Sequence, residues 1–366
     1  MPHVQDSPDL AAVRDALFAA ERVVLTTHQR PDGDALGTEI AIARALRSLG
    51  KEATILNADP TPRNLDWLVE EQPDGLVQIH ESGDLAQAQA VAEADVLMVV
   101  DTNAGHRIGE VGTVFQQAGK PVLLLDHHPD PEGWFDVACV RTEAAAAAEI
   151  AYDLLAGHDP ALIDRDVATA LYVGIMTDTG SFRYGATTPR THAIVADVLD
   201  RGGLRPEPIH IAIFDGRSRE SLALLSAALG TIQTHYEGRL ATMFVTGEMV
   251  RQSGAFFDET EGLINYALSL DGVLAATIFL EVVSGVKVSF RSKGDCPING
   301  WAGQFGGGGH ANASGAFVRG GQLRRVMKDV VDAAPPHVAA GSLFEEESDD
   351  LSDADLDLLA QFKGSL

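Results

Sequence analysis

Histidines and aspartates recur directly after short apolar runs in the first half of this chain. Such side chains bind divalent cations when several converge, because imidazole nitrogens and carboxylate oxygens are both metal ligands. Four segments carry them after candidate strands: HQRPDGD, the aspartate after DVLMVV, the tripeptide after PVLLL, and the aspartate in GIMTDTGSF. The residues concerned are His28, Asp32, Asp34, Asp101, Asp126, His127, His128 and Asp178.

These carboxylates and imidazoles would repel one another if they met without compensating charge. Two divalent cations would supply that charge, and a mixed donor set suits manganese while also accepting magnesium, iron or cobalt. Two ions about 3.5–4 Å apart can activate a water and hold phosphoryl oxygens during an in-line displacement. Each residue alone has a plainer explanation, since a strand-end aspartate commonly caps a helix or turn. Spacing alone leaves both interpretations open.

The apolar runs and helical patterns around these residues predict a parallel α/β domain. The runs are rich in valine and leucine and are separated by helical patterns, which indicates a parallel sheet covered on both faces. Sites in such open sheets form beyond the carboxyl ends of the strands. The expected strands are 22–27, 53–58, 95–100 and 121–125, and the expected helices are 35–49, 143–157 and 166–176.

The second half of the chain predicts a helical connector followed by a smaller α/β domain. Pro206 and Pro208 are expected to interrupt the connector. The later elements are strands at 239–245, 273–283, 286–291 and 314–318, a glycine-rich loop at 306–309, a helix at 321–333 and an acidic run at 345–357. The expected domains are 1–187 for metal binding and catalysis, 188–231 as connector, 232–338 for substrate binding, and 339–366 as acidic tail.

Composition limits the classes of partner. The chain has 366 residues and a formal net charge of −26, and such acidity disfavours binding to long duplex nucleic acid. Its two cysteines have no C-x-x-C spacing, so neither a disulfide framework nor a cysteine-type zinc site is expected. The N-terminus lacks the basic start and apolar run of a signal peptide, and no apolar run is long enough for a membrane span. We therefore expect a cytoplasmic protein.

Several segments of the chain resemble the motifs of the DHH phosphoesterases. HQRPDGDALG, VVDTN, LDHHP and MTDTGSF are similar to the four motifs of the catalytic domain. FRS at 290–292 and FGGGGHANASG at 305–315 are similar to the DHH-associated C-terminal domain. The resemblance spans about residues 15–335, and the combination is far more specific than a lone DHH tripeptide. It implies an active site in the cleft between a parallel-sheet domain and a smaller α/β domain.

The resemblance also implies a role for each motif residue. Asp101 would bridge two metal ions, and His128 would contact the scissile phosphate, where it stabilises developing charge or assists the leaving group. Asp126 would orient the adjacent histidines without binding metal itself. One metal ion would be held by His28 and Asp32, and the other by Asp34, His127 and Asp178.

The C-terminal motif implies substrate recognition. Glycines let backbone N–H groups approach an anion closely, and the guanidinium of Arg291 suits bidentate phosphate contact. Arg107 is a further candidate for the cleft. One stretch departs from the family pattern, because 143–149 reads EAAAAAE where some relatives carry serine or threonine, which removes hydroxyl contacts there. The expected substrate-binding residues are Arg291, Ser292, Gly307, Gly308, Gly309 and His310.

Length and motifs narrow the choice within the family. RecJ-type exonucleases carry an additional nucleic-acid-binding domain, family II pyrophosphatases lack the GGGH motif, and membrane-bound cyclic dinucleotide enzymes carry transmembrane segments. The chain therefore most resembles stand-alone nanoRNases that also act as pAp phosphatases, or soluble cyclic-di-AMP phosphodiesterases. We expect it to hydrolyse substrates of about two to five nucleotides with water activated by two metal ions. A homodimer is expected because it is common in relatives.

A second hypothesis of another class is a catalytically inactive nucleotide-binding regulatory protein. Against it, every metal-motif position is filled by a competent residue. Manganese-stimulated release of mononucleotides from pApA or pGpG would separate the two hypotheses. A purely structural α/β protein would leave the coincidence of the motifs unexplained.

Overall fold

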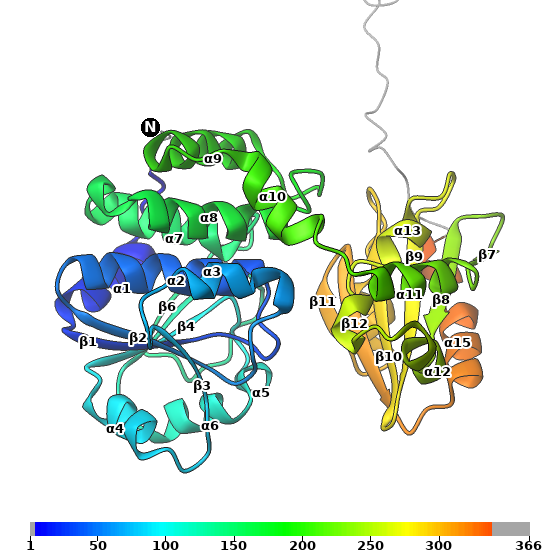
Figure 1. The fold of residues 1–366 in the computed structure, drawn as a ribbon, viewed down its shortest axis with the longest axis horizontal. Helices are drawn as coiled ribbons and strands as arrows, with labels where there is room; N and C mark the ends of the chain where they lie inside the picture. Colours follow the sequence, from blue (N-terminus) through cyan, green and yellow to red (C-terminus); the bar gives the residue numbers. More distant parts are fainter. Residues whose placement is uncertain (1–3, 339–366) are drawn as a thin grey trace, which may run out of the picture. The chain divides into compact units, whose positions relative to one another are not determined.

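The structure, a computed structural model, describes residues 4–338. Contacts divide the chain into two compact units, with the division between Gly216 and Arg217 (Figure 1). This division falls inside the predicted connector at 188–231, whose first two helices belong to the first unit and whose last helix belongs to the second. The predicted acidic run at 345–357 lies outside the described residues.

The first unit is built on a six-stranded sheet in the order β3-β2-β1-β4-β5-β6, and all its strand pairs are parallel. The predicted parallel sheet is confirmed. The chain reverses its direction of winding between β1 and β4, and ligand sites in open sheets form at such a switch point. The strands are β1 (Arg22–Thr26), β2 (Glu52–Asn57), β3 (Val77–Ile79), β4 (Val96–Val100), β5 (Val122–Asp126) and β6 (Val137–Val140).

Helices cover both faces of this sheet, as its apolar strands require (Figure 1). Side chains of α1, α2, α7 and α8 form the core on one face, and side chains of α4 and α6 pack on the other. The helices are α1 (Pro8–Ala19), α2 (Gly33–Ser48), α3 (Asp66–Glu70), α4 (Leu85–Glu93), α5 (Gly105–Ile108), α6 (Glu110–Gln117), α7 (Ala147–His158), α8 (Arg165–Asp178), α9 (Pro189–Gly202) and α10 (Pro206–Phe214), with short 3-10 turns at Arg63–Leu65 and Pro160–Leu162.

The helices around three predicted features differ from the prediction. Asp178 does not follow a strand, because it is the last residue of α8. The helix predicted at 143–157 begins only at Ala147, since the preceding residues form a turn beside the sheet. Pro206 starts α10 rather than interrupting a helix, because proline is well suited to a first helical position, where its missing N–H costs nothing.

Helices α2 and α8 pack closely through glycines. A Cβ atom at Gly37 would lie 2.4 Å from the carbonyl oxygen of Ala170. A Cβ atom at Gly174 would lie 2.6 Å from the Cβ of Ala148 and 3.0 Å from Asp34 Oδ1. These glycines allow the backbones to approach until the start of α2 and the end of α8 lie side by side.

The second unit contains a six-stranded mixed sheet in the order β11-β12-β10-β9-β8-β7. Only β8 and β9 pair in parallel, and the other neighbours are antiparallel. The glycine-rich loop predicted at 306–309 is partly a strand, because its last residues pair with β12. The strands are β7 (Gln233–His235), β8 (Leu240–Val245), β9 (Ala275–Val282), β10 (Gly285–Ser292), β11 (Gly308–His310) and β12 (Ala313–Arg319).

Two apolar cores hold the helices of the second unit to this sheet. Trp301 and Val330 belong to one core, in which α14 and α15 pack against β9 and β10. Leu224 and Ile264 belong to the other, in which α11 and α13 pack against β8 and β9. No helix among the described residues combines the length and apolar character needed to span a bilayer. The helices are α11 (Arg219–Leu229), α12 (Gly247–Ser253), α13 (Ile264–Leu268), α14 (Asn299–Gly303), α15 (Leu323–Asp332) and α16 (Pro335–Val338), with a 3-10 turn at Phe257–Thr260.

Candidate functional site

The start of α2 places one aspartate beside a histidine from the loop that follows β1. Asp32 caps the helix, because its Oδ1 accepts hydrogen bonds from the N–H groups of Asp34 at 3.0 Å and Ala35 at 3.1 Å. Its other oxygen, Oδ2, lies 3.8 Å from His28 Nε2. The helix-cap interpretation of this aspartate is therefore correct, and capping still leaves one oxygen facing the histidine.

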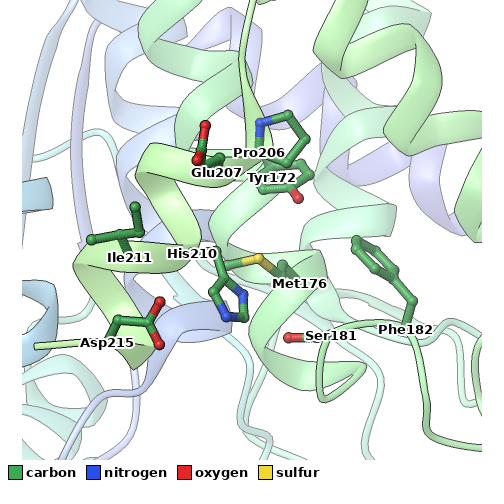
Figure 2. Close-up of a pocket in the computed structure, with 9 residues that line it drawn as sticks. All are labelled: Tyr172, Met176, Ser181, Phe182, Pro206, Glu207, His210, Ile211 and Asp215. Atoms are coloured by element: carbon green, nitrogen blue, oxygen red, sulfur yellow. The ribbon is translucent and has the colours of Figure 1, made fainter. Parts of the chain in front are cut away.

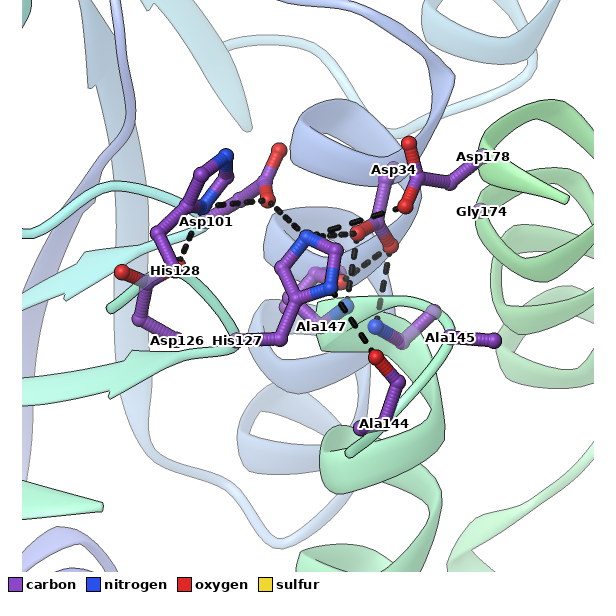
Figure 3. Close-up of polar contacts among 12 residues, drawn as sticks. Asp34, Asp101, Asp126, His127, His128, Ala144, Ala145, Ala147, Gly174 and Asp178 are labelled. Carbon is purple, nitrogen blue, oxygen red and sulfur yellow. Dashed lines mark hydrogen bonds and ion pairs between the residues drawn. The ribbon is translucent and has the colours of Figure 1, made fainter. Parts of the chain in front are cut away.

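Asp34, in the first turn of α2, is buried and is held by the N-terminus of α7. Its Oδ2 accepts a hydrogen bond from Ala147 N at 2.6 Å, and its Oδ1 accepts one from Ala148 N at 2.9 Å (Figure 3). The N-cap residue of α7 is Ala146, which has no side chain to satisfy these N–H groups. The alanine-rich stretch at 143–149 therefore supports the site through its backbone.

Asp101 follows β4 and lies between two histidines. It is 2% exposed and has the left-handed backbone conformation, with φ 55°. Its Oδ2 lies 3.4 Å from His28 Nε2, and its Oδ1 lies 3.4 Å from His127 Nε2. Each carboxylate oxygen thus faces a different histidine, which is the geometry expected of a residue shared by two metal ions.

Two further carboxylates, those of Asp34 and Asp178, lie close to His127. Its Nδ1 lies 3.2 Å from the carbonyl oxygen of Ala144, which orients the ring. Its Nε2 then lies 3.9 Å from Asp34 Oδ2 and 3.6 Å from Asp178 Oδ2 (Figure 3). Asp178, the last residue of α8, therefore lies beside His127, which directly follows β5.

Asp126 and His128 form a separate pair at the end of β5. The carboxylate Oδ1 of Asp126 lies 2.9 Å from His128 Nδ1, and Asp126 is fully buried. His128 Nδ1 is 3.9 Å from Asp101 Oδ1, so the ring borders the ligand cluster. Asp126 contacts one of the two neighbouring histidines, which suits an orienting function.

The pKa values of these groups depend strongly on burial and on neighbouring charges. Burial raises the pKa of Asp34 well above its usual range, and the charges of Asp101 and Asp178 add to the rise. Burial also favours a higher pKa for Asp101, but hydrogen bonds with His127 and His28 hold that pKa well below its usual range. Burial lowers the pKa of His28, but its hydrogen bond to Asp101 and nearby carboxylates raise it to about 9.

The donor set fits divalent metal ions. Among the described residues of the first unit, three groups have one potential ligand atom per residue, all within 4.8 Å of one another: His28 with Asp32 and Asp101, Asp34 with Asp101 and His127, and Asp101 with Asp126 and His128. Asp101 Oδ1 is buried and lies 3.4 Å from His127 Nε2 and 3.9 Å from His128 Nδ1. Bound cations would replace the imidazole protons as the charge that balances these carboxylates. Mixed histidine and carboxylate ligands suit Mn²⁺ and related ions.

Most of the predicted substrate-binding residues of the second unit lie on β10 and β11, the two strands that flank β12. Arg291 and Ser292 end β10, and His310 ends β11. The glycines have a packing reason, because a Cβ atom at Gly307 would lie 2.0 Å from the carbonyl oxygen of Gly315. Gly309, with φ 136°, would bring its Cβ to 2.6 Å from Ala313 O. The hairpin that holds His310 therefore requires glycine whether or not an anion is bound.

Sequence reasoning overlooked two residues of the first unit. Asn103 donates hydrogen bonds through Nδ2 to His128 O at 2.8 Å and Pro129 O at 3.0 Å, and so fixes the loop after β5. Its place two residues after the strand-end aspartate was the available signal. Glu39 is buried on α2 and accepts a hydrogen bond from Asn57 Nδ2 at 2.9 Å. Burial raises the pKa of Glu39 to about 8, although Asn57 lowers it.

Arg107 has a structural contact that the sequence did not indicate. Its carbonyl oxygen accepts a hydrogen bond from Gln29 N at 2.6 Å, which ties the loop after β1 to the short helix α5. Gln29 directly follows His28, so this backbone contact supports the position of the histidine.

A pocket of about 550 Å³ lies elsewhere in the first unit (Figure 2). Tyr172 and Met176, one turn apart on α8, line it, whereas Gly174 on the same helix faces Asp34. The lining residues within 4–338 include no arginine or lysine that could pair with a phosphate group. None of the predicted site residues is among the lining residues, which are Tyr172, Met176, Ser181, Phe182, Pro206, Glu207, His210, Ile211 and Asp215.

Comparisons with known proteins match both units of the chain to known domains. The DHH family, N-terminal domain, matches residues 22–175, and the DHHA1 domain matches residues 238–334. The bifunctional oligoribonuclease and PAP phosphatase NrnA of Thermus thermophilus is 31% identical over 326 residues, which cover 88% of this chain and 92% of that protein. The protein of the same name from Bacillus subtilis is 25% identical over 320 residues, or 87% of this chain and 96% of that protein.

A solved structure shares the fold. The crystal structure of an exopolyphosphatase-related protein from Bacteroides fragilis matches with a TM-score of 0.84 and 24% sequence identity. The match covers 93% of this chain and 100% of that chain. The two-domain architecture predicted from the sequence is therefore confirmed at the level of the fold.

Proposed function

Because the chain belongs to the DHH family and carries a DHHA1 domain, we propose that it is a metal-dependent phosphoesterase acting on very short oligonucleotides, on 3′-phosphoadenosine 5′-phosphate, or on both. The observation that carries this proposal is the placement of Asp101, which faces His28 through one oxygen and His127 through the other. An isolated capping aspartate has no reason to be buried between two imidazoles.

The metal ligands proposed here fall into two sets. One ion would be held by His28 and Asp32, with Asp101 shared between both ions. When bound, the ions activate a water and neutralise the charge of the phosphoryl oxygens. We propose Mn²⁺ as the native metal ion, because the donors mix imidazole and carboxylate. The second ion would be held by Asp34, His127 and Asp178, together with Asp101.

The remaining motif residues orient the reacting groups. Asp126 engages Nδ1 of His128, so Nε2 is the ring nitrogen proposed to face the scissile phosphate. There the imidazole would stabilise developing charge or protonate the leaving oxygen. Asn103 keeps the loop of His128 in place through its two carbonyl contacts.

Substrate recognition is proposed for the second unit. Arg291 would give a bidentate contact to a phosphate, and Ser292, His310 and the N–H groups of Gly307–Gly309 would add further donors. Short substrates suit a chain with a formal net charge of −26, because a long polyanion would meet repulsion beyond the site. We also propose a homodimer, which light scattering during gel filtration would test.

A turnover panel with Mn²⁺ tests the proposal. The substrates are pApA, pGpG, pAp, a five-nucleotide RNA, cyclic di-AMP and pyrophosphate. We expect the linear dinucleotides or pAp to react fastest, and we expect a chelator to abolish turnover. Faster hydrolysis of cyclic di-AMP would instead assign the chain to the cyclic dinucleotide phosphodiesterases. Absence of turnover on every substrate would favour the inactive nucleotide-binding protein.

A further inference from the structure

Asn312 lies in the tight turn between β11 and β12 and ties this turn to the end of β10. Its side-chain Nδ2 donates hydrogen bonds to Ser292 Oγ at 2.8 Å and to Gly294 O at 3.0 Å. Its carbonyl oxygen accepts a hydrogen bond from Ser292 N at 3.0 Å. Asn312 therefore contacts Ser292 through both its side chain and its backbone, two residues after His310.

The direction of these hydrogen bonds fixes the chemistry of the Ser292 hydroxyl. Gly294 O can only accept, so the amide of Asn312 must direct its nitrogen to this side. The same nitrogen donates to Ser292 Oγ, which uses a lone pair of the hydroxyl as an acceptor. Within residues 4–338, the hydroxyl proton of Ser292 has no acceptor of its own. The hydroxyl is thus left to donate to a ligand.

This polarity matches a phosphate. A phosphate oxygen accepts hydrogen bonds and at neutral pH has few or no protons to donate. Asn312 itself is exposed and Ser292 is half-buried, so the pair does not serve an apolar core. We propose that Asn312 is a positioning residue that orients the Ser292 hydroxyl as a donor to a phosphate of the substrate. This inference rests on the proposed function, because it concerns one of the proposed recognition contacts: the hydrogen bond that the Ser292 hydroxyl would donate to the substrate.

This orientation of the Ser292 hydroxyl requires an amide, and not a carboxylate, at position 312. An aspartate has the same size but only accepts hydrogen bonds when ionised. In Asn312→Asp the Ser292 hydroxyl would turn and donate to the new carboxylate. The donor to the substrate would be lost, and a negative charge would be added close to the phosphate site.

A double-mutant cycle on the full chain tests the inference. The variants are Ser292→Ala, Asn312→Ala and the double variant, assayed with pApA and Mn²⁺. Each single substitution should raise KM about tenfold with little change in kcat, as expected for loss of a binding contact to a charged group. The double variant should be no more than about twofold worse than either single variant, because both remove the same contact. Multiplying losses, or a loss confined to kcat, would overturn the inference.

Asn312→Asp extends the cycle and guards against misfolding of the alanine variant. It should lower kcat/KM for pApA further than Asn312→Ala, and adding Ser292→Ala to Asn312→Asp should cause almost no additional loss. An additional loss as large as that of Ser292→Ala in the wild-type chain would contradict the inference. Asn299→Ala is the matched control, since this exposed asparagine of the same unit accepts a local hydrogen bond from its neighbour Gly300 N at 3.0 Å. Failure of the wild-type chain to hydrolyse pApA would instead remove the proposed function.

Discussion

The candidate metal ligands of the first unit and the hairpin β11–β12 of the second unit, proposed here to recognise substrate, are built in opposite ways. In the first unit Asp34, Asp101 and His127 are each at most 5% exposed, and helix ends and strand ends fix them. In the second unit Asn312 and the glycines before His310 lie at the surface of a short hairpin. The first site is held by tertiary packing, whereas the second is held by hydrogen bonds across one turn.

Because of this difference, substitutions in the two units should impair activity in two different ways. A change in the ligand cluster should reduce turnover of every substrate, because it removes a metal ion from the reaction. A change in the hairpin should alter KM and depend on the substrate, because it removes a recognition contact. Substitutions in each unit can therefore test whether catalysis and recognition divide in this way.

The largest expected effect is that of Asp101→Asn. Loss of the shared carboxylate should lower kcat/KM on pApA at least about 1,000-fold, because both metal ions lose a charged ligand. The fold should persist, since asparagine tolerates the left-handed conformation at φ 55°. Steady-state kinetics with Mn²⁺ and circular dichroism would measure both. Asp130→Asn is the control, because Asp130 is exposed and shares this conformation, with φ 59°. Near-wild-type turnover of Asp101→Asn would contradict the assignment of a site for two metal ions.

Gly174→Ala tests whether helix packing sets the ligand geometry. The new methyl group would lie 2.6 Å from the Cβ of Ala148 and 3.0 Å from Asp34 Oδ1. Helices α7 and α8 must therefore move apart, and the N–H group of Ala148 that holds Asp34 moves with α7. We expect about a 100-fold loss of kcat, since a displacement near 1 Å can have that effect, and a loss of about 1–3 kcal/mol of unfolding free energy. Urea denaturation and kinetics would measure the two. Gly185→Ala, with no atom within 4 Å of its new Cβ, should be neutral.

His310→Ala probes the hairpin. It should raise KM for pApA about tenfold, as expected for loss of a hydrogen bond to a charged group. KM for bis-p-nitrophenyl phosphate, which has no nucleotide to recognise, should rise less. His235→Ala is the control, because this half-buried histidine of the same unit pairs with Thr242 Oγ1 at 3.0 Å. An equal loss on both substrates would argue against recognition by the hairpin.

Mn²⁺ should also raise the thermal stability of the folded protein. At a free concentration of 100 Kd, a bound ion stabilises the folded state by about 2.7 kcal/mol, which corresponds to a rise in Tm of roughly 5–10 °C for a unit of this size. Calorimetry with and without Mn²⁺ would measure it. Asp101→Asn should show a clearly smaller rise, and an identical rise in both proteins would place the bound metal elsewhere.

Strand-end residues were predictable because the sheet is parallel. All its strands end at one edge of the sheet. Once the apolar runs are recognised as strands, Asp101 and Asp126 are therefore expected to lie close together. Asp178 was predicted as a site residue but was assigned to the wrong kind of element, because it ends α8. The contributions of Ala147 and Ala148 could not be predicted, since they act through N–H groups that every residue has.

Residue types and apolar runs were sufficient to assign the family, the parallel sheet and the chemistry of the candidate ligands. How these ligands are held depends on packing between distant segments. The N–H groups of α7 reach Asp34 because glycines let α2 and α8 approach closely, and Asn312 reaches Ser292 because β10 and β12 pair in register. Such contacts join residues far apart in the chain, and their geometry exists only after the backbones have packed.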